Sequence, residues 1–193
     1  MKKIIILLML LITTYSSESY SQDSENNIFK KNSPEYIYSY VQENFNWIKI
    51  GNYDYHVIYV LLKYEEGKTE KLYNLLKKYE NEASFRLIFY GGNDKDSINL
   101  SAYLSTFNTK DALEKTMSGQ YVFPDVMKNP ILIESYNINQ SKIINDLLPM
   151  YEINNLLFQT PNFLYKVDNT IKFIYGYPNA EFLEKMIEEA EWE

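Results

Sequence analysis

Cysteine is absent from the sequence. Because disulfide exchange requires a thiolate nucleophile, the chain cannot carry out thiol–disulfide chemistry, and its stability must come from packing alone. The single histidine, His56, argues against a metal site, which typically needs three or four ligands. Glycine and proline are scarce, with six residues of each, which excludes fibrous and disordered classes of chain.

Basic residues are also in deficit. The 19 Lys and Arg residues are outnumbered by 26 Asp and Glu residues, which gives a formal net charge of −7. Nucleic-acid binding requires basic patches that neutralise phosphates, so we expect no nucleic-acid partner. Hydrophobic residues make up 46% of the 193 residues, enough to bury the core of one globular domain.

The N-terminus has the pattern of a secretory signal peptide over residues 1–21. Lys2 and Lys3 precede an unbroken apolar run over 4–12, and small residues at Ser19 and Ser21 follow. The run is shorter than the roughly 20 residues that span a bilayer, and no second long apolar run follows. We therefore expect a protein of the periplasm or cell exterior with no membrane span after signal cleavage.

Residues 22–50 are expected to form an acidic tail followed by a helix that starts at Ser33 and Pro34. The chain over 51–193 is expected to form the main domain. Continuous apolar runs over 56–62 and 84–90 predict two strands that are buried on both faces. The helical pattern over 69–79 between them permits parallel pairing.

A helical insertion is expected over about 97–150. Helical patterns cover 97–107, 110–117 and 141–151, and Pro149 is expected to kink or end the last of these helices. The segment between Gln120 and Asn139 has no clear pattern, and its role stays open.

The chain is expected to close with a hairpin and a helix. The hairpin strands cover 162–167 and 170–175, and they flank a turn at Asp168 and Asn169. Asn179 is expected to cap a final helix with one face toward the sheet. That face consists of Phe182, Leu183, Met186, Ile187 and Ala190. The order βαβ, helical insertion, ββα predicts an α/β, thioredoxin-like fold.

Three segments resemble the catalytic domain of the periplasmic disulfide isomerases of the DsbC and DsbG kind. The strand over 56–62 and the helix after it match the isomerases' first strand and active-site helix. The stretch from Phe85 to Glu114 is similar to their second strand and inserted helices. Thr160 and Pro161, with the hairpin and helix that follow, resemble their Thr-cis-Pro segment and C-terminal elements.

The resemblance also locates what has been lost. The isomerases' Cys-Pro-Tyr-Cys motif aligns with Glu66, Gly67, Lys68 and Thr69, which supply no thiolate. The chain is therefore similar to a divergent, cysteine-free member of the family, without catalytic residues, metal or cofactor.

The resemblance implies a groove that does not need cysteine. The residues expected to border it are Glu65, Glu66, Gly67, Lys68, Thr69, Thr160 and Pro161. A cis bond before Pro161 exposes the backbone of Thr160 for pairing with an extended peptide, although Pro161 can equally serve only to shape the fold. The isomerases also act as chaperones, so we expect a protein or peptide partner and a chaperone or assembly-factor role.

Two alternatives belong to other classes of protein. An accessory or structural subunit of an envelope secretion or conjugation machine would use the tyrosines of the first helix, Tyr36, Tyr38 and Tyr40, as its contact surface. An enzyme with new chemistry at Glu66 would need an enclosed pocket. The identity of the partner and the oligomeric state stay open.

The Gly67-Lys68-Thr69 sequence lies between a strand and a helix, where a phosphate-binding loop would lie. That motif needs a further glycine, and its position holds Leu62. We therefore expect an exposed loop and helix start there, without a bound nucleotide.

Overall fold

The computed structural model describes residues 33–120 and 128–190. The predicted signal peptide and acidic tail lie outside these ranges, as does part of the segment from Gln120 to Asn139. The strands are β1 (Ile48–Ile50), β2 (Val57–Leu62), β3 (Ser84–Phe89), β4 (Asn162–Val167) and β5 (Thr170–Tyr175). The helices are α2 (Pro34–Asn44), α3 (Lys68–Lys78), α4 (Lys95–Phe107), α5 (Lys110–Met117), α6 (Pro130–Ser141), α7 (Leu148–Ile153) and α8 (Ala180–Glu189). A π-helical stretch, Lys142–Leu147, joins α6 to α7.

The five strands form one sheet in the order β1-β3-β2-β4-β5. β2 and β3 pair in parallel, as expected for two strands joined by a helix, while β4 runs antiparallel to β2. β4 and β5 form the predicted hairpin, and Asp168 and Asn169 at its turn both have positive φ. Two such residues are typical of a type I′ turn, whose twist matches that of the strands.

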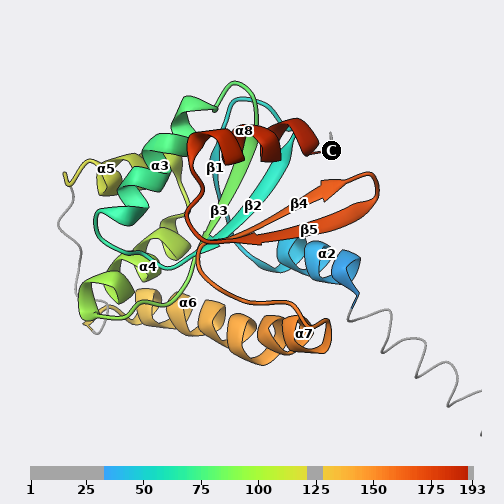
Figure 1. Ribbon diagram of the computed structural model, residues 1–193. Coiled ribbons are helices and arrows are strands. Elements are labelled where there is room, and N and C mark those ends of the chain that lie inside the picture. The colour runs from blue at the N-terminus through green and yellow to red at the C-terminus, as the bar shows by residue number, and fades with distance from the viewer. Residues whose placement is uncertain (1–32, 121–127, 191–193) are drawn as a thin grey trace, which may run out of the picture.

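Every residue of β2 and β3 is buried, because both faces of the sheet are covered by helices. In Figure 1, α3 and α8 lie on one side of the sheet, and α2, α6 and α7 lie on the other. Alternate side chains of β2 divide between the two layers. Val60 packs in the core with α3 and α8, while Tyr59 packs in the core with α2 and the π-helical stretch.

The topology and one backbone feature identify the fold class. A βαβ unit is followed by helices, a hairpin and a final helix, and the Thr160–Pro161 peptide bond before β4 is cis. The fold is thioredoxin-like, as the sequence predicts. No helix within the two described ranges has the length and apolarity that a membrane span requires.

Two local predictions need correction. Of the two alternatives for Pro149, the end of the helix is wrong, because helical structure continues to Ile153. The π-helical turns before Pro149 shift the hydrogen-bond register, so this proline lies in the first turn of α7, where its missing N–H is tolerated. Phe182 does not face the sheet and is 41% exposed. It precedes the buried Leu183 by one residue, and one residue turns an α-helix by about 100°.

Side chains cap the N-termini of α2, α4, α5, α6 and α8, and the cap of α4 is charged. Asp94 caps α4 by accepting hydrogen bonds from the backbone N–H of Ser97 (2.8 Å) and from its hydroxyl (2.7 Å). These hydrogen bonds hold the pKa of the Asp94 carboxyl below its usual value of 3.8. A lowered pKa in the folded state means that the cap stabilises above the unfolded-state pKa and loses this contribution as the pH falls through the folded-state value.

We expect Asp94→Asn to keep the fold at neutral pH, since Asn caps helices as well as Asp does. Because its side chain does not titrate, the variant should lose less stability than the wild type between pH 5 and the acid limit of folding, measured as the urea midpoint at each pH. Ser97→Ala removes one of the two hydrogen-bond donors to Asp94. Its loss of stability with falling pH should be intermediate between that of the wild type and that of Asp94→Asn. Identical pH slopes for the wild type and Asp94→Asn would contradict this assignment.

Candidate functional site

A groove of about 570 Å³ lies where β2 and β3 end and where β4 begins. These three strand ends meet at one edge of the sheet because β4 runs opposite to the other two. The helical insertion supplies the far wall. The described residues that line the groove are Lys63, Tyr90, Gly92, Gln140, Ile143, Ile144, Leu148, Phe158, Gln159 and Thr160.

The far wall is apolar. Ile143, Ile144 and Leu148 come from the π-helical stretch and the first residue of α7. Ile143 is buried, whereas Ile144 is 57% exposed although it is a large hydrophobic side chain. Exposed apolar surface beside polar groups is typical of a binding site.

Aromatic rings form the base of the groove. The rings of Tyr90 and Phe158 lie 5.8 Å apart between centroids, and Phe158 meets Tyr151 edge-on at 4.9 Å. Burial raises the pKa of the Tyr90 hydroxyl, against a smaller opposing effect of its hydrogen bond with Thr160, and burial also raises that of Tyr151. Both phenols are therefore protonated at neutral pH and carry no charge into the groove.

The side chain of Thr160 links two strand ends. Its hydroxyl accepts a hydrogen bond from the backbone N–H of Lys63 at 2.9 Å and also bonds to the Tyr90 hydroxyl. Within the described residues, the backbone N–H and C=O of Thr160 have no backbone hydrogen-bond partner. The next residue is held from the other side, since the carbonyl of Pro161 accepts a bond from the N–H of Gly176 at 2.9 Å.

A buried amide positions the loop that leads into β4. Asn162 is fully buried, and its Oδ1 accepts a hydrogen bond from the Tyr151 hydroxyl at 3.0 Å. Its Nδ2 donates to the carbonyl of Leu157 at 3.5 Å. These bonds hold the loop that carries Phe158 and Thr160 against α7.

The predicted loop of Glu65 to Thr69 is separated in the chain from Lys63, which lines the groove, by one residue, Tyr64. Glu66, Gly67 and Lys68 are exposed. The Thr69 side chain is buried, and its hydroxyl accepts a hydrogen bond from the N–H of Glu65 at 2.8 Å. The ammonium of Lys68 lies 2.7 Å from the Glu65 carboxylate.

Tyrosines and carboxylates surround the position that the resemblance assigns to the lost thiols. The Tyr64 hydroxyl donates to Glu70, and the ammonium of Lys68 lies 5.7 Å from the ring centre of Tyr177. Burial and the nearby Glu65 carboxylate raise the pKa of Tyr177 to about 12. The pKa of Tyr64 is raised by burial and by its hydrogen bond with Glu70, so both tyrosines are protonated at neutral pH. Glu66 is exposed to solvent.

Of the seven residues predicted to border a groove, Thr160 lines the one described here and Pro161 follows it directly. Sequence reasoning missed the residues that make up most of its walls, Lys63, Tyr90, Ile144, Leu148 and Phe158 among them. They lie far apart in the chain, and each has an ordinary local pattern. The sequence offered a signal for two of them, Lys63 and Tyr90, because each directly follows a buried strand and the ends of parallel strands lie close together.

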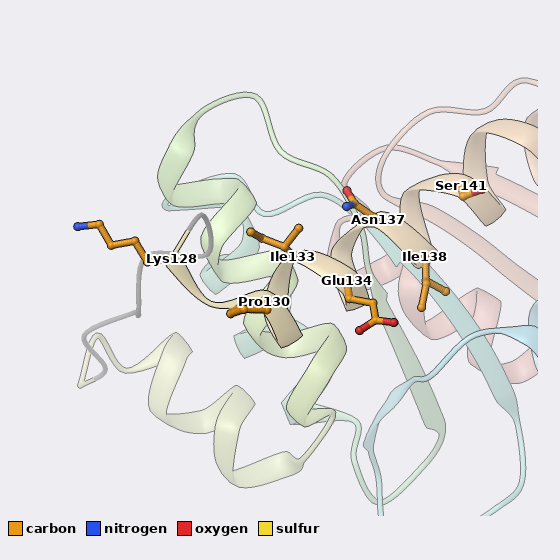
Figure 2. Close-up of a pocket in the computed structure, with 7 residues that line it drawn as sticks. All are labelled: Lys128, Pro130, Ile133, Glu134, Asn137, Ile138 and Ser141. Carbon is orange, nitrogen blue, oxygen red and sulfur yellow. The ribbon is translucent and has the colours of Figure 1, made fainter.

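A second hollow, of about 580 Å³, follows the outer side of α6. Figure 2 shows its lining side chains along this one helix, with Lys128 reaching away from the others. Because the described lining residues come from a single helix and the turn before it, they enclose a ligand less well than the groove at Thr160. Within the described ranges, no group of three or more Asp, Glu or His side chains could hold a metal ion.

No protein family model and no curated protein sequence matches the chain. Solved structures do match it. A linker-deletion mutant of Proteus mirabilis ScsC shares 16% identity over 92% of this chain and 90% of that one, with a TM-score of 0.49. A periplasmic thioredoxin-like protein from Salmonella enterica serovar Typhimurium shares 14% identity over 79% of this chain and 94% of its own, with a TM-score of 0.47.

The thiol–disulfide exchange protein alpha-DsbA2 from Wolbachia pipientis is a third match. It shares 18% identity over 86% of this chain and 97% of its own, with a TM-score of 0.45. The particular resemblance to the DsbC and DsbG isomerases stays a prediction.

We expect Tyr151→Phe to lower the free energy of unfolding by about 1–3 kcal/mol, because the buried Oδ1 of Asn162 loses its donor. Urea unfolding followed by intrinsic fluorescence measures the loss. Tyr53→Phe is the matched control, since Tyr53 is 51% exposed. It should change stability by less than about 0.5 kcal/mol. Equal stability of the two variants would contradict the role of Asn162 in holding the loop.

Proposed function

We propose that this protein is a redox-inactive, thioredoxin-like binding protein that takes an extended peptide segment into the groove beside Thr160. The proposal rests on two features of the groove: one wall is apolar, and the backbone groups of Thr160 are available for hydrogen bonding to a peptide. Ile144 and Leu148 offer apolar contact across from Thr160, whose N–H and C=O lack backbone partners within the described chain. Backbone pairing supplies affinity for any extended chain, and the apolar wall selects its side chains.

Thiol chemistry is not part of the proposal, because the chain contains no cysteine. A protein with the fold of a thiol exchanger but no thiol can still recognise an unfolded or extended client. The chaperone activity of the isomerases that the sequence resembles supports a holdase or assembly-factor role. The loop from Glu65 to Lys68, whose residues 66–68 are exposed, would then form the rim of the site and contact the client beyond the groove.

We further propose that the protein works in the periplasm or at the cell exterior. The charged and apolar pattern over residues 1–21 supports export. A fold stabilised by packing, without disulfides, does not depend on the redox state of its compartment.

The alternative of a structural subunit of an envelope machine receives less support. Its proposed contact surface was the set of tyrosines on α2, and two of these are engaged within the chain. Tyr38 is buried edge-on against Tyr59, and the Tyr40 hydroxyl donates to Asp146 at 2.5 Å.

We expect Ile144→Ser to weaken the binding of a short, uncharged, leucine-rich peptide about tenfold, which corresponds to about 1.4 kcal/mol. The physical reason is the loss of apolar area that the peptide would cover. Fluorescence anisotropy with a labelled peptide measures the affinity. Because Ile144 is largely exposed, the substitution should leave the fold intact.

The control is Ile153→Ser, which removes an isoleucine of similar exposure, 61%, from the end of α7. Ile153 does not line the groove. The Ile153→Ser variant should therefore bind the peptide with the affinity of the wild type. Equal weakening by both substitutions, or by neither, would count against the groove as the binding site.

A further inference from the structure

A single charged side chain distinguishes the groove from a simple apolar cleft. Of the ten described residues that line it, Lys63 alone is charged. Its backbone N–H is bonded to the Thr160 hydroxyl, so the side chain starts directly beside the open backbone of Thr160. The ammonium lies 5.9 Å from the centre of the Tyr90 ring.

Among the residues that the structure describes, none places a carboxylate within 4 Å of this ammonium. Six other lysines of the described chain lie 2.7 to 3.7 Å from an acidic side chain: Lys49, Lys68, Lys77, Lys110, Lys115 and Lys185. Within the described residues, Lys63 makes no such contact, although it is partly buried and the chain has 26 acidic residues. A cation left without an internal counter-ion in a groove is available to an anion from outside.

The backbone keeps room for this side chain. A Cβ at Gly91 would lie 3.3 Å from the Lys63 Cε and 2.9 Å from the Gln140 Nε2, and the positive φ of +60° at this position favours glycine. The absence of a side chain at residue 91 thus lets Lys63 and Gln140 lie side by side along the groove. Together they offer an ammonium and an amide to one bound group.

We propose that the groove recognises a carboxylate next to an apolar residue in its client, with Lys63 as the counter-ion. The proposal rests on the function proposed above and names its ligand chemistry. The apolar side chain would lie on Ile144, Leu148 and Phe158, while the carboxylate would meet Lys63 near Thr160. Charge-assisted hydrogen bonds in a partly enclosed site are stronger than those in open water. The carboxylate comes from the C-terminus of a client or from an internal Asp or Glu.

Three versions of one short leucine-rich peptide separate these sources: one with a free C-terminal carboxylate, one amidated, and one amidated with an internal glutamate beside a leucine. Fluorescence anisotropy at neutral pH and low salt measures each affinity. We expect the wild type to bind at least one carboxylate peptide about tenfold more tightly than the neutral one, and we expect this preference to fall with salt. The peptide that gains affinity identifies the source.

Three variants test the residue. Lys63→Met should bind all three peptides alike, with the wild-type affinity for the neutral one. Lys63→Arg should keep the preference. Lys78→Met, which removes an exposed lysine from the end of α3, carries the same charge change as Lys63→Met and should behave as the wild type.

The outcomes distinguish the two proposals. Binding of the neutral peptide without any preference for a carboxylate, or a preference that survives in Lys63→Met, overturns the role of Lys63 and leaves the peptide groove standing. Binding of none of the three peptides overturns both.

Discussion

The pairing of β2 with β4 is the constraint on which the candidate site depends. Their antiparallel register brings Leu61 opposite Asn162, just before both strands reach the edge of the sheet. Beyond that point, the backbone hydrogen bonds between β2 and β4 end, and the backbone N–H of Lys63 instead donates a hydrogen bond to the side-chain hydroxyl of Thr160. Within the described residues, the backbone N–H and C=O of Thr160 have no backbone hydrogen-bond partner at this end of the sheet.

The helical insertion converts this open edge into a groove. The π-helical stretch is tied to the N-terminal helix, since Lys142 donates to the carbonyl of Asn44 and Asp146 accepts from Tyr40. Ile143 and Leu147 of this stretch pack into the core on the face of the sheet that α2 covers. Ile144, the residue after Ile143, is largely exposed and lines the groove. One irregular helix therefore anchors the wall and presents its apolar surface.

The position that the sequence resemblance assigns to the isomerases' cysteines, at the start of α3, has protonated tyrosines and a hydrogen-bonded threonine around it. Tyr64 and Tyr177 have raised pKa values because of burial and neighbouring carboxylates. The hydroxyl of Thr69 is used inside the protein, as an acceptor for the N–H of Glu65. This hydrogen bond ties the loop to the start of α3, and among the described residues that line the groove the one charged side chain is that of Lys63.

The sequence by itself determined the order and type of the elements. The continuous apolar runs of β2 and β3, the caps at Ser33, Thr109 and Asn179, and the turn after β4 all act over a few residues, so local patterns predict them. The absence of cysteine excludes thiol chemistry on composition alone. Only the tertiary structure decided that Lys63, Ile144 and Thr160 face one groove, because strand pairing and helix packing join positions about a hundred residues apart. It also decided that Lys63 has no internal counter-ion within the described chain, since the nearness of charges depends on the folded path and not on composition.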